Sequence, residues 1–563
     1  MMSAVESGGS EYQTAVVGAA SLVKGILDRL GVAQTIDRFL NHQPEVPTTY
    51  GALAQVIIVN RMSFHPQPLY QLAPWAQRHG IDRMFNLHPV WLDDDRMGAM
   101  LEALADQQVS IWGALSKGAI KKFQVPLDWL HTDTTSIYFE GSYQDQEGNP
   151  KGGGERVPRL VEGYNKDGQR HKAQLVLSLT TSGRVPVWYR PWDGNQTDDG
   201  VYLADLQELR QNLLAPENAV LIGDCKVCNR TTLLAFCRQG QQFLAAHPWT
   251  PTAKKVWLET LQRLDAGELT WEEVEYVSRN QARKPKTQQN RYLVCAVPQQ
   301  LPDLQRNAVY PLRWLFYWSS SKADRDFRQR QKVLEAGEKA FQRVARLVGK
   351  YGYTTHQRIE DRIEQALVKA GAREYFQYWV LGRKGDRPEA LWWGLREEAV
   401  AAAERFDGIA LLCTSIPSER LSDRAALAKY KEQVQVEQTI DFLKSPIQIR
   451  PMWLHSPKRL AGLTLLIMIA VLVAALLEHQ VRRWVQESGQ LLRGLMPERR
   501  DNPYPTARAL LRAFEDYALV LIMHSSGEEE VHYSKLRPVQ QQIWEIMGLD
   551  PLPGQILTEG SGK

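Results

Sequence analysis

Residues 130–139 read LHTDTTSIYF, and their alternating side chains predict a β-strand with Asp133 inside it. Aspartate is depleted in strand interiors, so its presence there needs a reason. Residues 219–224 read AVLIGD, a short apolar strand that ends in Asp224. An unpaired carboxylate beside a buried strand is costly, so we expect a bound cation near both aspartates. The alternatives are a polar strand start for Asp133 and a helix N-cap for Asp224.

A third carboxylate, Glu437, lies in a segment whose pattern predicts one helix over residues 430–444. Tyr430, Glu437 and Lys444 are seven residues apart and would share a face of that helix. Glu432 and Asp441 compete with Glu437, and a solvated charged helix is the alternative. Three such carboxylates could hold two divalent cations about 3.5–4 Å apart for phosphoryl transfer.

The order of the expected elements indicates the fold class. Three strands are followed by a helix, a strand, a helix and a strand, which is the order of the ribonuclease-H-like fold. The sequence therefore predicts an α/β core with a mixed five-stranded sheet flanked by helices. The expected strands cover residues 127–139, 173–180, 185–190, 219–224 and 242–246, and the expected helices cover 201–214 and 231–238.

The stretch between Asp224 and Glu437 is too long for an ordinary connection, so part of it must be an inserted domain. The expected organisation is a helical N-terminal domain, a core in two parts interrupted by a large α+β insertion, and a helical C-terminal region. The expected bounds are 1–125 for the N-terminal domain, 126–248 and 405–485 for the two parts of the core, 249–404 for the insertion and 486–563 for the C-terminal region. The N-terminal domain is expected to bind DNA.

Composition excludes little by itself. The chain has 68 basic and 64 acidic residues, and a net charge of +4 does not indicate a nucleic-acid partner. Five cysteines in 563 residues form no disulfide framework, which favours a reducing cytoplasm. Cys225 and Cys228 form a CxxC pair without a second pair nearby, so we expect buried thiols rather than zinc ligands. The first ten residues are polar and carry no secretory signal.

Residues 460–477 are apolar and carry no charge. Their length is at the short end of the roughly 17–25 residues that span a membrane. We expect a helix buried in a large core and no membrane; a membrane anchor is the alternative reading.

A basic segment follows the expected helix of Glu437. Basic side chains interleaved with aromatic ones suit phosphate contacts and base stacking, although an ordinary surface loop would look similar. The basic residues are Lys444, Arg450, Lys458 and Arg459, with Trp453 and His455 between them.

Several of these motifs resemble those of DDE transposases of bacterial insertion sequences, in the insertion sequence 4 superfamily and its insertion sequence 1634 branch. Tyr430, Glu437 and Lys444 match the signature around the third acid, with Gln433 where that signature has arginine. The first block is met by residues 133–135 and 163–167. The Gly-Asn-x-x-Asp turn is met by residues 194–198, and residues 60–75 and 93–96 resemble the preceding helical domain.

The resemblance implies an enzyme that binds the terminal inverted repeats of its own element and moves it by cut-and-paste transposition. Two Mg²⁺ ions per active site, replaceable by Mn²⁺, would be held by Asp133, Asp224 and Glu437. Tyr430 would join the basic residues in contacting DNA. The resemblance further implies a homodimer in a paired-end complex with target DNA, located in the cytoplasm at the nucleoid. The alternatives are a metal-dependent nuclease of the same fold and a domesticated, non-catalytic DNA-binding protein.

Overall fold

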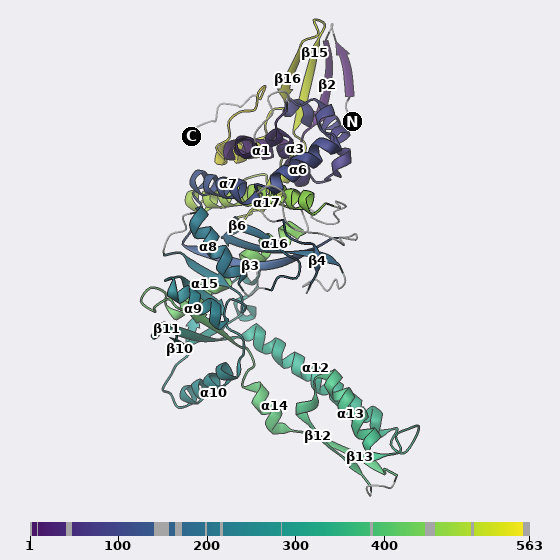
Figure 1. Ribbon diagram of the computed structural model, residues 1–563, viewed down its shortest axis with the longest axis vertical. Helices are drawn as coiled ribbons and strands as arrows, with labels where there is room; N and C mark the ends of the chain where they lie inside the picture. The colour runs from purple at the N-terminus through teal and green to yellow at the C-terminus, as the bar shows by residue number, and fades with distance from the viewer. Residues whose placement is uncertain are drawn as a thin grey trace. The chain divides into compact units, whose positions relative to one another are not determined.

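The computed structural model describes residues 3–7, 10–40, 48–139, 157–163, 172–197, 200–213, 218–282, 284–382, 387–444, 456–496 and 500–555. The chain forms two compact units (Figure 1). The first unit combines Met1–Phe243 with Glu432–Lys563, and the second is the continuous segment Leu244–Lys431. The second unit is wider than the insertion expected at 249–404.

A mixed sheet lies in the first unit. Its strands are β3 (Trp129–Tyr138), β4 (Val161–Glu162), β5 (Ala173–Ser182), β6 (Val185–Trp192) and β7 (Val220–Gly223). β5 pairs antiparallel with β3 on one side and with β4 and β6 on the other, whereas β3 pairs parallel with β7. β8 (Gln242–Ala246) begins in this unit and ends in the second. Helices α8 (Val201–Leu213) and α9 (Arg230–Arg238) separate β6, β7 and β8 along the chain, so the expected mixed α/β architecture is confirmed.

The N-terminal residues of the first unit are mostly helical, as expected. These helices are α1 (Ala20–Leu30), α2 (Val32–Phe39), α3 (Tyr50–Met62), α4 (Leu72–Arg78), α5 (Ile81–Met84), α6 (Asp94–Ala105) and α7 (Gln108–Phe123). Two short 3₁₀ turns, Leu69–Gln71 and Pro89–Trp91, connect them. Capping side chains mark the starts of α3 and α6: Thr49 accepts the N–H of Ala52, and Asp93 accepts that of Arg96.

The apolar segment forms a single long helix, α17 (Pro457–Ser488), in the interior of the first unit. It contacts α3, α6 and α7 as well as β6 and α16, so it lies between the N-terminal helices and the sheet (Figure 1). Gly462 allows the closest approach, because a Cβ there would meet the carbonyl oxygen of Leu101 at 2.0 Å. Within the described residues α17 is the one helix long and apolar enough to cross a membrane, and its apolar window is fully buried inside the fold. That burial agrees with the expected core position.

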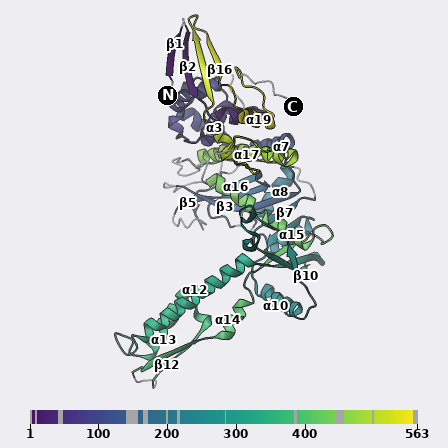
Figure 2. The same cartoon turned by 180° about the vertical axis from the view of Figure 1, so that it is seen from behind.

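The C-terminal region, expected to be helical, also contains a β-hairpin. β15 (Ala518–His524) and β16 (Glu529–Tyr533) lie between α18 (Ala507–Arg512) and α19 (Pro538–Ile546). β15 pairs with β2 (Ser10–Val16), which pairs with β1 (Ser3–Ser7), giving an antiparallel sheet in the order β1-β2-β15-β16 (Figure 2). Leu519 and Leu521 alternate into the interior of this sheet, which accounts for the strand. The two ends of the sequence therefore share one sheet.

In the second unit the strands pair in the order β8-β14-β11-β10-β9. Its strands after β8 are β9 (Glu272–Val274), β10 (Tyr292–Asp303), β11 (Ala308–Ser319) and β14 (Ile409–Thr414). Its helices include α10 (Pro251–Asp265), α11 (Arg279–Ala282), α14 (Glu397–Glu404) and α15 (Asp423–Lys431). β14, expected to re-enter the core, pairs with β11 and β8, which explains why the second unit extends to residue 431.

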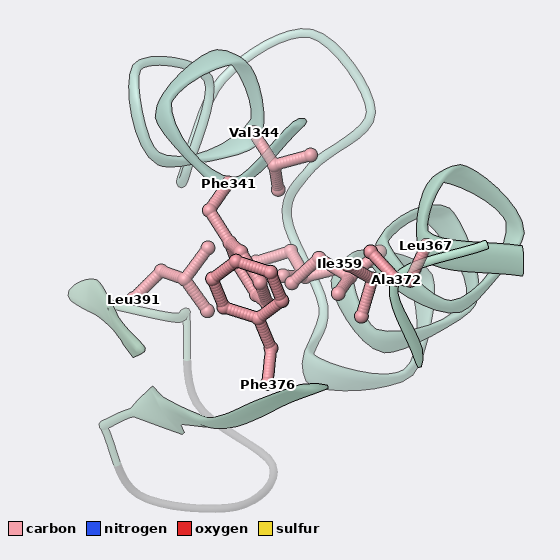
Figure 3. Packing of buried hydrophobic residues seen from close by; sticks show 8 residues of the cluster. Phe341, Val344, Ile359, Leu367, Ala372, Phe376 and Leu391 are labelled. Carbon is pink, nitrogen blue, oxygen red and sulfur yellow. The ribbon is translucent and has the colours of Figure 1, made fainter. Parts of the chain in front are cut away.

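A separate hydrophobic cluster holds the middle of the second unit together. Helices α12 (Ser320–Ala345) and α13 (His356–Ala370) pack on the hairpin of β12 (Phe376–Leu381) and β13 (Ala390–Leu395). Phe341 is fully buried in this cluster, and its ring is tilted against that of Phe376 (Figure 3). The ring of Phe341 is also stacked on that of Trp393. The hairpin and both helices thus share a core of their own.

Candidate active site

Asp133 lies within β3, where it pairs with Leu179 of the antiparallel neighbour β5. On its other side β3 runs parallel to β7, with His131 opposite Ile222. The same register, continued by two residues, brings Asp133 level with Asp224 at the end of β7. The backbone N–H of Thr134 donates to Asp133 Oδ1 over 2.7 Å. The order of these strands was predicted from the sequence, but their pairing was not. The parallel pairing of β3 with β7 places Asp133 and Asp224 at the same end of the two paired strands.

Asp224 follows directly on β7 and is held by two donors. The backbone N–H of Lys226 lies 3.0 Å from its Oδ1, and the hydroxyl of Tyr202 lies 3.2 Å from the same oxygen. The turn is tight, because a Cβ on Gly223 would lie 2.5 Å from Val227 Cγ2. Tyr202 was not predicted as part of the site, since nothing in the pattern of residues 201–214 relates this tyrosine to the acid that follows the next strand.

Glu437 lies in α16 (Val434–Lys444), and here the prediction of one helix over residues 430–444 is wrong. Tyr430 belongs to α15, which ends at Lys431 in the second unit, so Tyr430 and Glu437 do not share a helix. Between the helices the N–H groups of Gln435 and Val436 donate to carbonyls three residues back, a tighter pattern than the α-helix. Lys444 does lie on α16, two turns beyond Glu437.

The turn between β5 and β6 anchors α16. Thr439 Oγ1 donates to the carbonyl of Arg184 over 3.1 Å, and Arg184 Nη2 donates to the carbonyl of Gln438 over 3.5 Å. α16 also contacts β3, β5 and α17. Glu437 is exposed, whereas Val436 and Ile440 of the same helix are buried. One side of α16 is thus buried and fixed to the sheet, whereas Glu437 lies outside this buried side.

The electrostatics of Glu437 link it to Asp133. Partial burial raises the pKa of the Glu437 carboxyl above its ordinary value, and the negative charges of Asp133 and Asp441 raise it further. A divalent cation bound beside these carboxylates would reduce the repulsion between their negative charges. Within the described ranges of the chain, however, no three His, Cys, Asp or Glu side chains are grouped closely enough to hold a metal ion. Strand register thus relates Asp133 to Asp224, and charge repulsion relates Asp133 to Glu437. In the described part of the chain the three acids do not lie close enough together to form one set of metal ligands.

Apart from Tyr430 of α15, the predicted DNA-contacting residues fall into three groups. Lys458 and Arg459, at the start of α17, form ion pairs with acids near the C-terminal end of α6. Lys458 Nζ lies 2.6 Å from Asp106 Oδ2, and Arg459 Nε lies 2.7 Å from Glu102 Oε1. Lys444 ends α16. Arg450, Trp453 and His455 lie outside the described residues, as do residues 164–167 and Asp198 of the resemblance motifs.

A family model described as "Transposase DDE domain" matches residues 132–473, more than half of the chain. The chain belongs to the DDE transposase family. This DDE transposase is accordingly an enzyme that acts on DNA, and enzymes of its family generally use divalent metal ions. The expected transposase is confirmed at this level, while the insertion sequence 4 superfamily and its 1634 branch stay predictions.

Further comparisons give three results. A second model, "Domain of unknown function (DUF4277)", matches residues 12–112 of the transposase. A solved structure described as a piggyBac transposase synaptic complex with hairpin DNA aligns at 9% identity over 88% of this chain and 79% of that chain. Its TM-score is 0.36, which is too low to define the fold. No curated protein sequence matches the chain.

Proposed function

We propose that this DDE transposase cleaves DNA at the terminal inverted repeats of its own insertion sequence and joins the ends to target DNA. The acids of its site would be Asp133, Asp224 and Glu437. The register of β3 on β7 carries this proposal, because it relates two aspartates from distant parts of the matched domain. The raised pKa of Glu437 supports its place as the third acid, since the charge of Asp133 is among its causes.

The donor chemistry of the three acids fits Mg²⁺ or Mn²⁺, because hard divalent cations prefer carboxylate oxygens. Asp133, Asp224 and Glu437 would hold two ions. Bound there, the ions would lower the pKa of the attacking water or 3′-hydroxyl and stabilise the leaving oxygen. The chain's own part is to fix the carboxylates, through the Thr134 N–H at Asp133 and the two donors at Asp224.

The strand order β6-β5-β3-β7 supports a ribonuclease-H-like core, with the second unit as its insertion. DNA would be held along α16 by Lys444. Lys458 and Arg459 contribute less in this proposal than their charge suggests, because Asp106 and Glu102 already neutralise them. A homodimer that pairs two element ends, in the cytoplasm at the nucleoid, completes the proposal.

The test is nicking of a DNA duplex that carries the element end, with Mg²⁺. Asp133→Asn, Asp224→Asn and Glu437→Gln should each abolish nicking and leave DNA binding near the wild-type level, because each removes a ligand oxygen without changing side-chain size. Asp128→Asn and Glu432→Gln are matched controls, since Asp128 is exposed just before β3 and Glu432 lies in the break before α16; both should nick normally. Full activity in any of the three site variants refutes the assignment. Nicking without any joined product would instead favour a nuclease of the same fold.

A further inference from the structure

Tyr202 reaches the candidate site from a separate element. It is the second residue of α8, which follows the β5–β6 hairpin and precedes β7. Its side chain is only 1% exposed, and its hydroxyl lies 3.2 Å from Asp224 Oδ1. A buried tyrosine hydroxyl needs a partner, and here the partner is a carboxylate 22 residues further along the chain.

The two donors to Asp224 differ in origin but converge on one oxygen. The N–H of Lys226 closes a local turn two residues long, and this bond alone leaves the carboxylate free to rotate about its Cβ–Cγ bond. The Tyr202 hydroxyl approaches from another element, so the two bonds together fix the plane of the carboxylate. Fixing a ligand in this way before the metal arrives lowers the cost of ordering it.

We infer that Tyr202 is a positioning residue for the divalent cation: it anchors Asp224 Oδ1, so that Oδ2 serves as the ligand oxygen. The inference rests on the proposed function, since it takes Asp224 as a metal ligand. Tyr202 touches neither DNA nor metal in this account and acts only through Asp224. Its loss should therefore change the affinity for the ion more than the rate at saturating ion.

The experiment measures Mn²⁺ binding to the full-length transposase by electron paramagnetic resonance, without DNA, for Tyr202→Phe. We expect the affinity to fall by about tenfold or more, as is usual when the partner of a metal ligand is removed. The Mg²⁺ concentration needed for half-maximal nicking should rise by a similar factor, with most of the maximal rate recovered at high Mg²⁺. Binding of the DNA end in the presence of chelator should be unchanged.

Tyr533→Phe is the matched control. Tyr533 is also a buried tyrosine of the first unit; it ends β16, and its ring is stacked on that of Tyr517. Both variants lose one buried hydroxyl, so a shared loss of thermal stability without a change in Mn²⁺ affinity would mean that Tyr202 is merely structural. If Tyr202→Phe does not fold, Tyr202→His supplies a ring N–H donor in its place, and Mn²⁺ affinity near that of Asp224→Asn would contradict the inference.

The variant Asp224→Asn distinguishes a failure of the role of Tyr202 from a failure of the proposed function. If it weakens Mn²⁺ binding and abolishes nicking while Tyr202→Phe binds Mn²⁺ within twofold of wild type, the role of Tyr202 is refuted and the proposed function stands. If Asp224→Asn itself binds Mn²⁺ and nicks like the wild type, the metal assignment in the proposed function fails first. Weakened binding in Tyr202→Phe and Asp224→Asn, with Tyr533→Phe unchanged, supports the inference.

Discussion

Arg184 and Glu478 form a buried ion pair that joins the turn between β5 and β6 to α17, with 2.5 Å between Arg184 Nη1 and Glu478 Oε2. Glu478 is 3% exposed and also pairs with Arg482 over 2.8 Å. Its other oxygen accepts the N–H of Ala507 at the start of α18. One carboxylate thus ties three segments of the first unit together, and the turn it holds is the one that anchors α16.

Glu478→Ala should lower the free energy of unfolding by about 3–5 kcal/mol, because it leaves two partly buried guanidinium groups without their common acid. Urea unfolding followed by circular dichroism measures this. Glu487→Ala is the control on the same helix: Glu487 pairs with Arg483 at the surface, and its loss should cost about 0.5 kcal/mol or less. Equal losses in the two variants would contradict a structural role for Glu478.

Asp205 should make stability depend on pH. Burial raises the pKa of its carboxyl from 3.8 to about 7, against the lowering effects of Ser178 and Arg190. Between these values the folded state keeps a proton that the unfolded state has released. The free energy of unfolding therefore falls as pH rises through this window, by up to about 1.4 kcal/mol per pH unit.

Asp205→Asn removes this dependence. Relative to the wild type, the variant should gain stability between about pH 4 and pH 7, and the gain should level off above that range. Urea unfolding at several pH values checks this, with Asp265→Asn, an exposed residue of α10, as the control for the loss of one carboxylate. A constant difference for Asp205→Asn across the range would show that Asp205 titrates normally.

The cluster around Phe341 should behave as a local core of the second unit. Phe341→Ala should cost about 3–5 kcal/mol, because the ring is fully buried among Phe376, Tyr378 and Trp393. Hydrogen exchange should accelerate in α12, α13 and the β12–β13 hairpin. Phe327→Ala, on the same helix but 50% exposed, should change stability by about 0.5 kcal/mol or less. Unchanged exchange in Phe341→Ala would exclude a shared core.

Lys444 should contribute to DNA binding through phosphate rather than through bases. Lys444→Ala is expected to weaken binding to all duplex sequences about equally and to reduce the salt slope by about one unit, because one fewer counterion is released. Fluorescence anisotropy over a range of salt concentrations measures both. Lys535→Ala, an exposed lysine beyond β16, is the control and should leave the slope unchanged. A loss of sequence discrimination at constant slope would point to base contacts.

The strands that carry Asp133 and Asp224 were predictable because each has a local signature. Alternation defines β3, and the run AVLIG defines β7. The burial of α17 also followed from its composition together with its short length. What periodicity could not show was the pairing of β3 with β7, although the order of strands and helices was consistent with it.

The features that differ from the prediction depend on contacts between residues that are distant in the sequence. Residues 430–444 are helical on both sides of Glu432 and Gln433, and only the tight turn there, with Gln433 buried, separates two helices. The acids that pair with Lys458 and Arg459 lie on α6 and just after it, more than 300 residues earlier. β15 pairs with a strand at the other end of the sequence. None of these partners can be recognised from a short stretch of the sequence.

The position of α17 in the sequence has a consequence for biosynthesis. The second unit is one continuous segment, and its synthesis is complete once residue 431 is made. The first unit must wait, because the helix that α3, α6, α7 and β6 pack against ends only at residue 488 of 563. Until then the ribosome carries a chain whose apolar surfaces are uncovered, a state prone to aggregation. A transposase released before Pro457 would lack this helix altogether, so its first unit could not close around it.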